Sequence, residues 1–158
     1  MASRRKKSTL PVHLCDPQAG WIEVAVETPA FHFCEPVSCT PNDFVDELIA
    51  GLNLSMHGQP ATARASCEPT TFEFAFSPGQ CTDGLSFQIV RHANWGRSRG
   101  KGQAVLFFQG TRRAVVLSFW RALKALEGRV NAGKYREAMR REFPAQKLRT
   151  LSKLLGKD

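Results

Sequence analysis

Basic residues are almost absent from the first half of this sequence. Positions 9–90 contain one Lys or Arg, Arg64, against ten Asp or Glu. The other basic residues, which bring the formal net charge to +8, lie in residues 1–8 and 91–158. This distribution predicts an acidic half suited to a basic partner and a basic half suited to an acidic one, including nucleic acid.

Long apolar runs are also missing. The longest, near residues 105–108 and 114–117, are far too short to span a bilayer. No apolar segment of a signal peptide follows the basic residues 4–7. The five cysteines are odd in number and irregularly spaced. We therefore expect a cytoplasmic protein with free thiols and no association with membranes.

Motifs for metal binding and catalysis are incomplete. His13-x-Cys15 and His32-x-Cys34 each place two possible zinc ligands on one face of an extended segment, but the sequence has no CxxC pair. The glycine-rich residues 96–102 depart from the spacing of a phosphate-binding Walker loop. No local motif pairs a cysteine with a histidine for nucleophilic catalysis. We expect no metal, no cofactor and no enzymatic activity.

The middle of the chain is patterned as strands followed by a helix. Every second residue of segments 71–76 and 85–89 is Phe, Leu or Ile, which indicates two half-buried strands. Residues 104–108 are apolar on both faces, so we expect a central strand that is covered on both sides. Residues 114–126 repeat apolar side chains at every third or fourth position, which predicts an amphipathic helix on the phenylalanine face.

A hairpin and a helix are expected before this region. Residues 21–27 alternate between apolar and polar side chains, and a short second strand surrounds Phe31 and Phe33. Thr40 is the expected N-cap of a helix that ends near Leu54.

The last thirty residues are basic and helical in pattern. We expect a helix over residues 134–142, ended by Pro144, and then a narrow stripe of Leu148, Leu151 and Leu155. This segment either docks on the domain or forms a basic surface arm.

Together these patterns predict an α+β fold. A largely antiparallel sheet of five to six strands is packed by two amphipathic helices, and residues 13–128 form this single domain. Residues 1–12 are expected to be a basic flexible arm, and residues 129–158 a basic helical extension.

The chain resembles the WapI-type family of small bacterial immunity proteins, which protect a cell from polymorphic toxins. The resemblance covers about residues 20–128 and is carried by strand 21–27, Cys39-Thr40 before the first helix, Glu68-Pro69 before the aromatic strand, and residues 105–126 as closing strand and helix. It implies a non-enzymatic protein that neutralises a protein toxin, and it implies no catalytic residues.

The acidic half supplies the candidate partner-binding residues of this interpretation. They lie on outward strand faces or in the first turn of a helix: Glu23, Glu27, Asp43, Asp46, Glu47 and Glu73. An acidic face can occlude a cationic site on a toxin and speed association with it. The leading hypothesis is immunity-like neutralisation of a protein toxin or effector.

Two alternatives remain open, and the sequence leaves the oligomeric state undetermined. The first is a nucleic-acid-associated protein, such as a phage or ribonucleoprotein component, that binds the phosphate backbone. Its contacts would be Arg4, Arg5, Lys6, Lys7, Arg97, Arg99, Lys101, Arg140, Arg141, Lys147, Arg149 and Lys153. The second is a structural subunit that docks through the stripe of Leu148, Leu151 and Leu155.

Overall fold

The computed structural model describes residues 9–93 and 102–157. Its elements are β1 (Val12–Leu14), β2 (Trp21–Glu27), β3 (His32–Ser38), α1 (Phe44–Met56), β4 (Ala61–Ser66), β5 (Thr71–Pro78), β6 (Gly84–His92), β7 (Gln103–Thr111), α2 (Arg112–Arg129), α3 (Ala132–Met139) and α4 (Ala145–Leu154). The predicted α+β class with antiparallel pairing is confirmed. None of the described helices is both long enough and apolar enough to cross a membrane.

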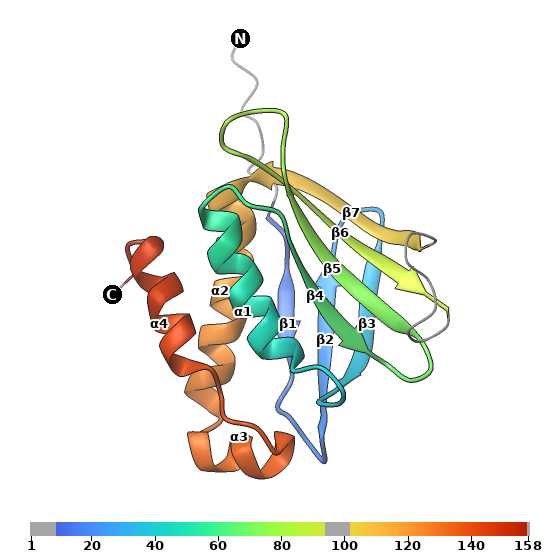
Figure 1. The fold of residues 1–158 in the computed structure, drawn as a ribbon, viewed down its shortest axis with the longest axis vertical. Helices are drawn as coiled ribbons and strands as arrows, with labels where there is room; N and C mark the ends of the chain where they lie inside the picture. Colours follow the sequence, from blue (N-terminus) through green and yellow to red (C-terminus); the bar gives the residue numbers. More distant parts are fainter. Residues whose placement is uncertain (1–8, 94–101, 158) are drawn as a thin grey trace.

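The strands form two sheets, where one sheet of five to six strands was predicted. One sheet has the order β1-β2-β3 and the other β4-β5-β6-β7, and every adjacent pair is antiparallel. Helix α1 lies between β3 and β4 in the chain, and β4 pairs with β5 and not with β3. In Figure 1 helices α1, α2 and α4 run alongside one another, next to the two sheets. Strand β3 contacts β4 and β7 without pairing with either.

A cluster of phenylalanine rings joins the sheets to the helices. Phe74 on β5 lies at the centre, with ring-centroid distances of 5.5 Å to Phe33 on β3 and 5.0 Å to Phe44 on α1. Its ring is 5.7 Å from Phe87 on β6 and 6.5 Å from Phe119 on α2. These edge-to-face contacts confirm that the alternating phenylalanines face the core and the second predicted helix.

Strand β7 is an edge strand, and the prediction of a central, doubly covered strand is wrong. It pairs only with β6 among the described strands, and the side chain of Phe107 is 50 % exposed. Leu106 and Phe108 face the core, as expected. Helix α2 follows directly, and its N-cap Thr111 accepts a hydrogen bond from the amide of Ala114 at 3.1 Å.

The start of α1 also differs from the prediction. Its N-cap is Asp43, whose carboxylate accepts a hydrogen bond from the amide of Asp46 at 3.1 Å, and not Thr40. The Thr40 amide instead donates to the hydroxyl of Ser38 at 3.2 Å. Asp and Thr are both good N-caps, so local sequence alone did not distinguish them.

The C-terminal helices belong to the same core as the rest of the domain. Their buried residues are Tyr135, Met139, Leu148, Leu151, Ser152 and Leu155. The indole of Trp120 on α2 donates to the hydroxyl of Ser152 at 2.8 Å. The leucine stripe is therefore covered by this chain, and docking on the domain is the alternative that the structure bears out.

The N-terminal boundary also lies earlier than predicted. Leu10 is buried and Val12 pairs with Val26, so residues 9–12 are part of the domain and not of an arm. Residues 1–8 lie outside the described residues.

Candidate functional site

The six predicted partner-binding carboxylates lie in three places. Asp43, Asp46 and Glu47 stand at the N-terminus of α1. Glu23 and Glu27 project from the outer face of β2, and Glu73 lies on the outer face of β5. The structure therefore gathers three of the six at one helix end and separates them from the others.

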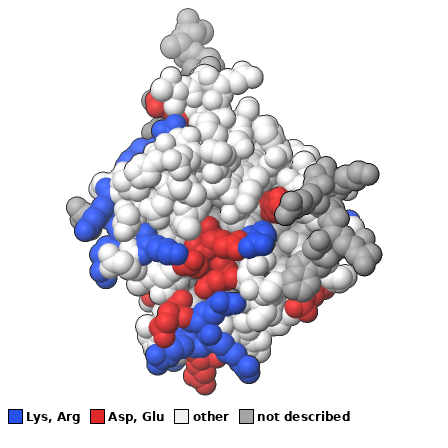
Figure 2. All heavy atoms as spheres, viewed as in Figure 1, with Lys and Arg blue, Asp and Glu red and all other residues white. Residues whose placement is uncertain are grey.

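Two of the three carboxylates at the start of α1 bond to other elements of the chain. Asp46 accepts from Lys147 on α4 at 2.8 Å, and Glu47 accepts from the guanidinium of Arg64 at 2.9 Å and from its backbone amide at 2.8 Å. Partial burial raises the pKa of Asp43 above its usual value, against the amide hydrogen bond that lowers it. In Figure 2 acidic atoms form a patch with basic atoms directly beside it, which reduces the charge available to a partner.

The other predicted acidic residues have weaker contacts within the chain. Glu27 lies 3.3 Å from His32, and Glu73 lies 3.4 Å from His92. Glu23 accepts from the thiol of Cys15 at 3.5 Å. None of these three has a Lys or Arg ion-pair partner in the described part of the chain, so Glu23 and Glu27 keep the outer face of β2 acidic.

The predicted nucleic-acid contacts fall into three groups. Those at residues 4–7, 97, 99 and 101 lie outside the described residues. Arg141 donates to the carbonyl of Cys39 at 2.9 Å, and Lys147 pairs with Asp46, so both attach the C-terminal helices to the domain. Arg140, Arg149 and Lys153 are exposed.

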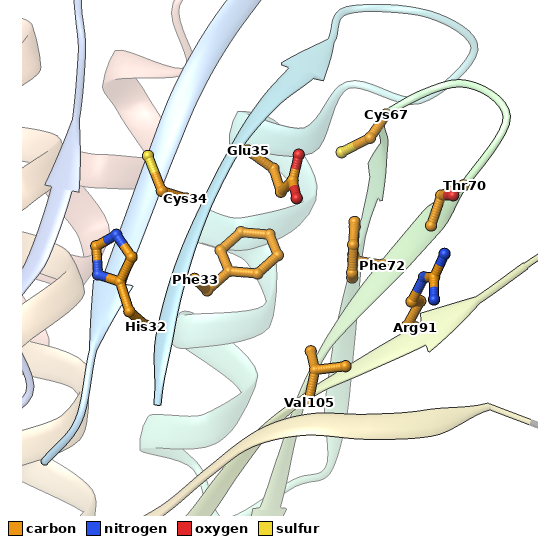
Figure 3. Close-up of a pocket in the computed structure, with 9 residues that line it drawn as sticks. All are labelled: His32, Phe33, Cys34, Glu35, Cys67, Thr70, Phe72, Arg91 and Val105. Carbon is orange, nitrogen blue, oxygen red and sulfur yellow. The ribbon is translucent and has the colours of Figure 1, made fainter. Parts of the chain in front are cut away.

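A groove opens where the free edge of β3 faces the ends of β5, β6 and β7. We call it the β3 groove; its volume is about 430 Å³, within the range of ligand pockets, and it is partly open to solvent. It is lined by His32, Phe33, Cys34, Glu35, Cys67, Thr70, Phe72, Arg91 and Val105. In Figure 3 Phe33 and Glu35 point from β3 toward the second sheet, whereas His32 and Cys34 lie on the other side of the strand.

Polarity changes along the β3 groove. At one level the ring of Phe33 lies 5.0 Å from that of Phe72, and Val105 continues this apolar surface. One step further along β3 the surface becomes acidic at Glu35, which faces the side on which Cys67 lies. Neither Glu35 nor the exposed Arg91 has an ion-pair partner among the described residues. The wall of the groove therefore has an apolar level at Phe33 and, further along β3, an acidic level at Glu35.

Backbone groups of β3 also face the groove. Thr28 and Phe31 exchange backbone hydrogen bonds at the end of the β2–β3 hairpin, and bonded pairs alternate along an antiparallel ladder. The next bonded residue on β3 is Phe33, two positions after Phe31. Cys34 lies between bonded positions, so its N–H and C=O point away from β2. Pro36, which has no N–H, occupies another of these outward positions, as is usual on an edge strand.

The thiols beside the groove are poor nucleophiles. Burial, assisted by the charge of Glu35, raises the pKa of Cys67 to about 12. Burial and the nearby Glu23 carboxylate also raise the pKa of Cys34, and the same two causes raise that of Cys15. Because the thiolate is the reactive form, a raised pKa makes each of these thiols less reactive near neutral pH. Residues 9–93 and 102–157 hold no cluster of His, Cys, Asp and Glu suited to a metal ion.

Sequence reasoning missed the groove, although one signal for it was present. The period of β3 places Glu35 on the same inward face as Phe33 and Val37, and Pro36 lies in the same strand. An inward-pointing charge and a proline are both features of edge strands. Arg91, Thr70 and the other residues of the far wall come from separate strands, and no local pattern connects them to β3.

Comparisons with known proteins give no assignment: no family model matches the chain, and neither curated proteins nor solved structures returned a match.

Proposed function

We propose that this protein is a non-enzymatic binding protein whose partner is another protein, and that it neutralises a toxin or effector in the manner of an immunity protein. The observation that carries the proposal is the β3 groove, which combines a free strand edge with apolar and acidic side chains. Two aromatic side chains outside the core, Phe31 and Phe107, are each 50 % exposed. Exposed aromatics are enriched at protein interfaces.

Charge supports a cationic partner for this surface. No Lys or Arg occurs between residues 9 and 63, a span that includes the whole β1-β2-β3 sheet. The carboxylates of Glu23, Glu27 and Glu35 have no Lys or Arg partner within the described residues, whereas Asp16 is paired with Arg129 at 2.9 Å. An acidic sheet steers a cationic toxin surface into contact and disfavours anionic competitors.

The test is affinity capture with the full chain as bait, in the presence of nuclease and at about 100 mM salt, where surface electrostatics still operate. The association kinetics of a captured protein are then measured with wild-type bait and with Glu23→Lys/Glu27→Lys. We expect the double reversal to slow association by roughly tenfold at low salt. Glu137→Lys/Glu142→Lys makes the same change of net charge on the exposed side of α3 and the segment after it, and we expect it to have little effect.

Two results contradict the proposal. Unchanged association of the Glu23→Lys/Glu27→Lys bait at low salt removes the role of the acidic sheet. Capture of nucleic acid alone, when nuclease is omitted, favours the second candidate function.

The observation that favours nucleic acid as a second candidate is a set of basic side chains within residues 121–157 that no carboxylate pairs with in the described structure. Arg121, Lys134, Arg140, Lys153 and Lys157 have no ion-pair partner in the described part of the chain. Binding through these residues would weaken steeply as salt is raised, because each neutralised phosphate releases counterions. A salt series on the intact chain tests this, because deleting the C-terminal helices would remove part of the core.

A further inference from the structure

We infer that the β3 groove binds an extended peptide segment of the partner, which adds to β3 as an antiparallel strand and carries a basic residue two positions before an apolar one. This inference rests on the proposed function and names the chemistry of the segment that the partner inserts.

Strand addition follows from the free backbone edge. The N–H and C=O of Cys34 point away from β2 and have no backbone partner in the described chain. A peptide residue placed opposite Cys34 can exchange two hydrogen bonds with it, as residues of neighbouring strands do in both sheets. Main-chain bonding of this kind supplies affinity without fixing the sequence of the peptide.

The side chains of β3 fix which residues the peptide carries. Phe33 and Glu35 occupy the positions on either side of Cys34, where an added antiparallel strand forms non-hydrogen-bonded pairs with closely spaced side chains. The peptide residue opposite Phe33 enters the apolar level beside Phe72 and Val105. The residue opposite Glu35 faces its carboxylate.

The direction of the peptide sets the order of the two residues. All strand pairs in the described sheets are antiparallel, and we assign the same orientation to the added strand. Reading the peptide from its N-terminus, the residue opposite Glu35 therefore comes first and the residue opposite Phe33 comes two positions later. The recognised pattern is Lys or Arg, any residue, then an apolar residue.

Charge complementarity favours a basic side chain at the peptide position opposite Glu35. Glu35 is half-buried and has no ion-pair partner within the described residues. No Lys or Arg occurs between residues 9 and 63 of the sequence. Arg91 stands across the groove beside Thr70, on the far wall and not on β3. A cation opposite Glu35 neutralises the carboxylate, whereas a peptide carboxylate at that position would meet like charge.

The experiment uses synthetic peptides and amide NMR spectra of the isotopically labelled full chain. The probe is Thr-Thr-Lys-Thr-Leu-Thr-Thr, compared with a peptide in which Glu replaces Lys and with one N-methylated at the threonine between Lys and Leu. We expect the lysine peptide to shift the amide signals of Cys34, Thr70 and Arg91 and to bind up to about fivefold more tightly than the glutamate peptide. N-methylation should weaken binding by roughly tenfold, because it removes one ladder bond and crowds the strand.

A specificity switch gives the sharpest readout. Glu35→Lys should reverse the preference, so that the glutamate peptide binds more tightly than the lysine peptide. Glu137→Lys makes the same change of charge at an exposed position on α3, away from the groove, and should keep the preference for lysine. Thermal unfolding of both variants checks that they are folded, and Glu35→Gln, which should abolish the preference, replaces Glu35→Lys if that variant unfolds.

Three outcomes overturn the inference: no shifts at β3 with up to several millimolar peptide, equal binding of the N-methylated peptide, or an unchanged lysine preference in the Glu35 variants. Each of these leaves the proposed function intact if affinity capture still yields a protein that depends on Glu23 and Glu27. Peptide binding without any captured protein would instead contradict the proposed function alone.

Discussion

Replacing Leu151 by Ala tests whether the C-terminal helix is part of the core. Leu151 lies in the middle of α4 with 0 % of its surface exposed, whereas Leu154 on the same helix is 37 % exposed. Because both changes are Leu→Ala within one helix, the difference in helix propensity is the same and small. Any difference between the two variants therefore reports burial.

The expected magnitude follows from that burial. A fully buried Leu→Ala change costs about 2–5 kcal/mol, from lost apolar burial and from the cavity that is left. For a chain of this size each kcal/mol lowers the melting temperature by roughly 2–4 °C, so Leu151→Ala should melt roughly 4–20 °C lower than the wild type. Leu154→Ala should change the stability by less than about 0.5 kcal/mol.

The assay is thermal and urea unfolding followed by circular dichroism. If α4 were a detachable basic arm, the two variants would be equally stable and both would resemble the wild type. Equal shifts of the two variants would refute our description of the core.

Two further predictions concern titratable groups. The folded-state pKa of Asp43 is raised, so ionising this carboxyl costs stability as the pH rises through its unfolded-state value toward the folded one. Asp43→Asn keeps an oxygen that accepts from the Asp46 amide, so by urea unfolding it should be more stable than the wild type at about pH 7 and lose that advantage at about pH 3. Asp43→Ala removes the cap and should cost about 1 kcal/mol. Cys67, with its pKa raised to about 12, should react with iodoacetamide at about pH 8 at least tenfold more slowly than the exposed Cys81. Mass spectrometry of the labelled peptides measures both rates, and similar rates would contradict the protonated state assigned to Cys67.

Period-two and helical patterns predicted most of the elements correctly. Segments 71–76, 85–89 and 114–126 lie within β5, β6 and α2, and their apolar residues face one core. These predictions succeeded because side-chain periodicity is a local property that burial of one face imposes.

The errors concern relations between elements. Residues 104–108 look like a central strand, but the place of β7 is set by tertiary pairing, and among the described strands it pairs only with β6. Likewise, the split into two sheets depends on which strands pair with one another in the tertiary fold. The groove escaped prediction for the same reason, since Glu35, Cys67 and Arg91 meet only through the tertiary fold.

The contacts of α4 have a consequence for the kinetics of folding. Lys147 bonds to Asp46 across a sequence separation of 101 residues, and Asn53 bonds to the carbonyl of Lys147 across 94. Contacts this distant in sequence require the closure of a very long loop, and the entropy cost of that closure disfavours their formation early in folding. We therefore expect α4 to dock late, after the transition state. Substitutions on its buried face would then leave the folding rate nearly unchanged and act mainly by accelerating unfolding, which makes α4 the element that sets the lifetime of the native state.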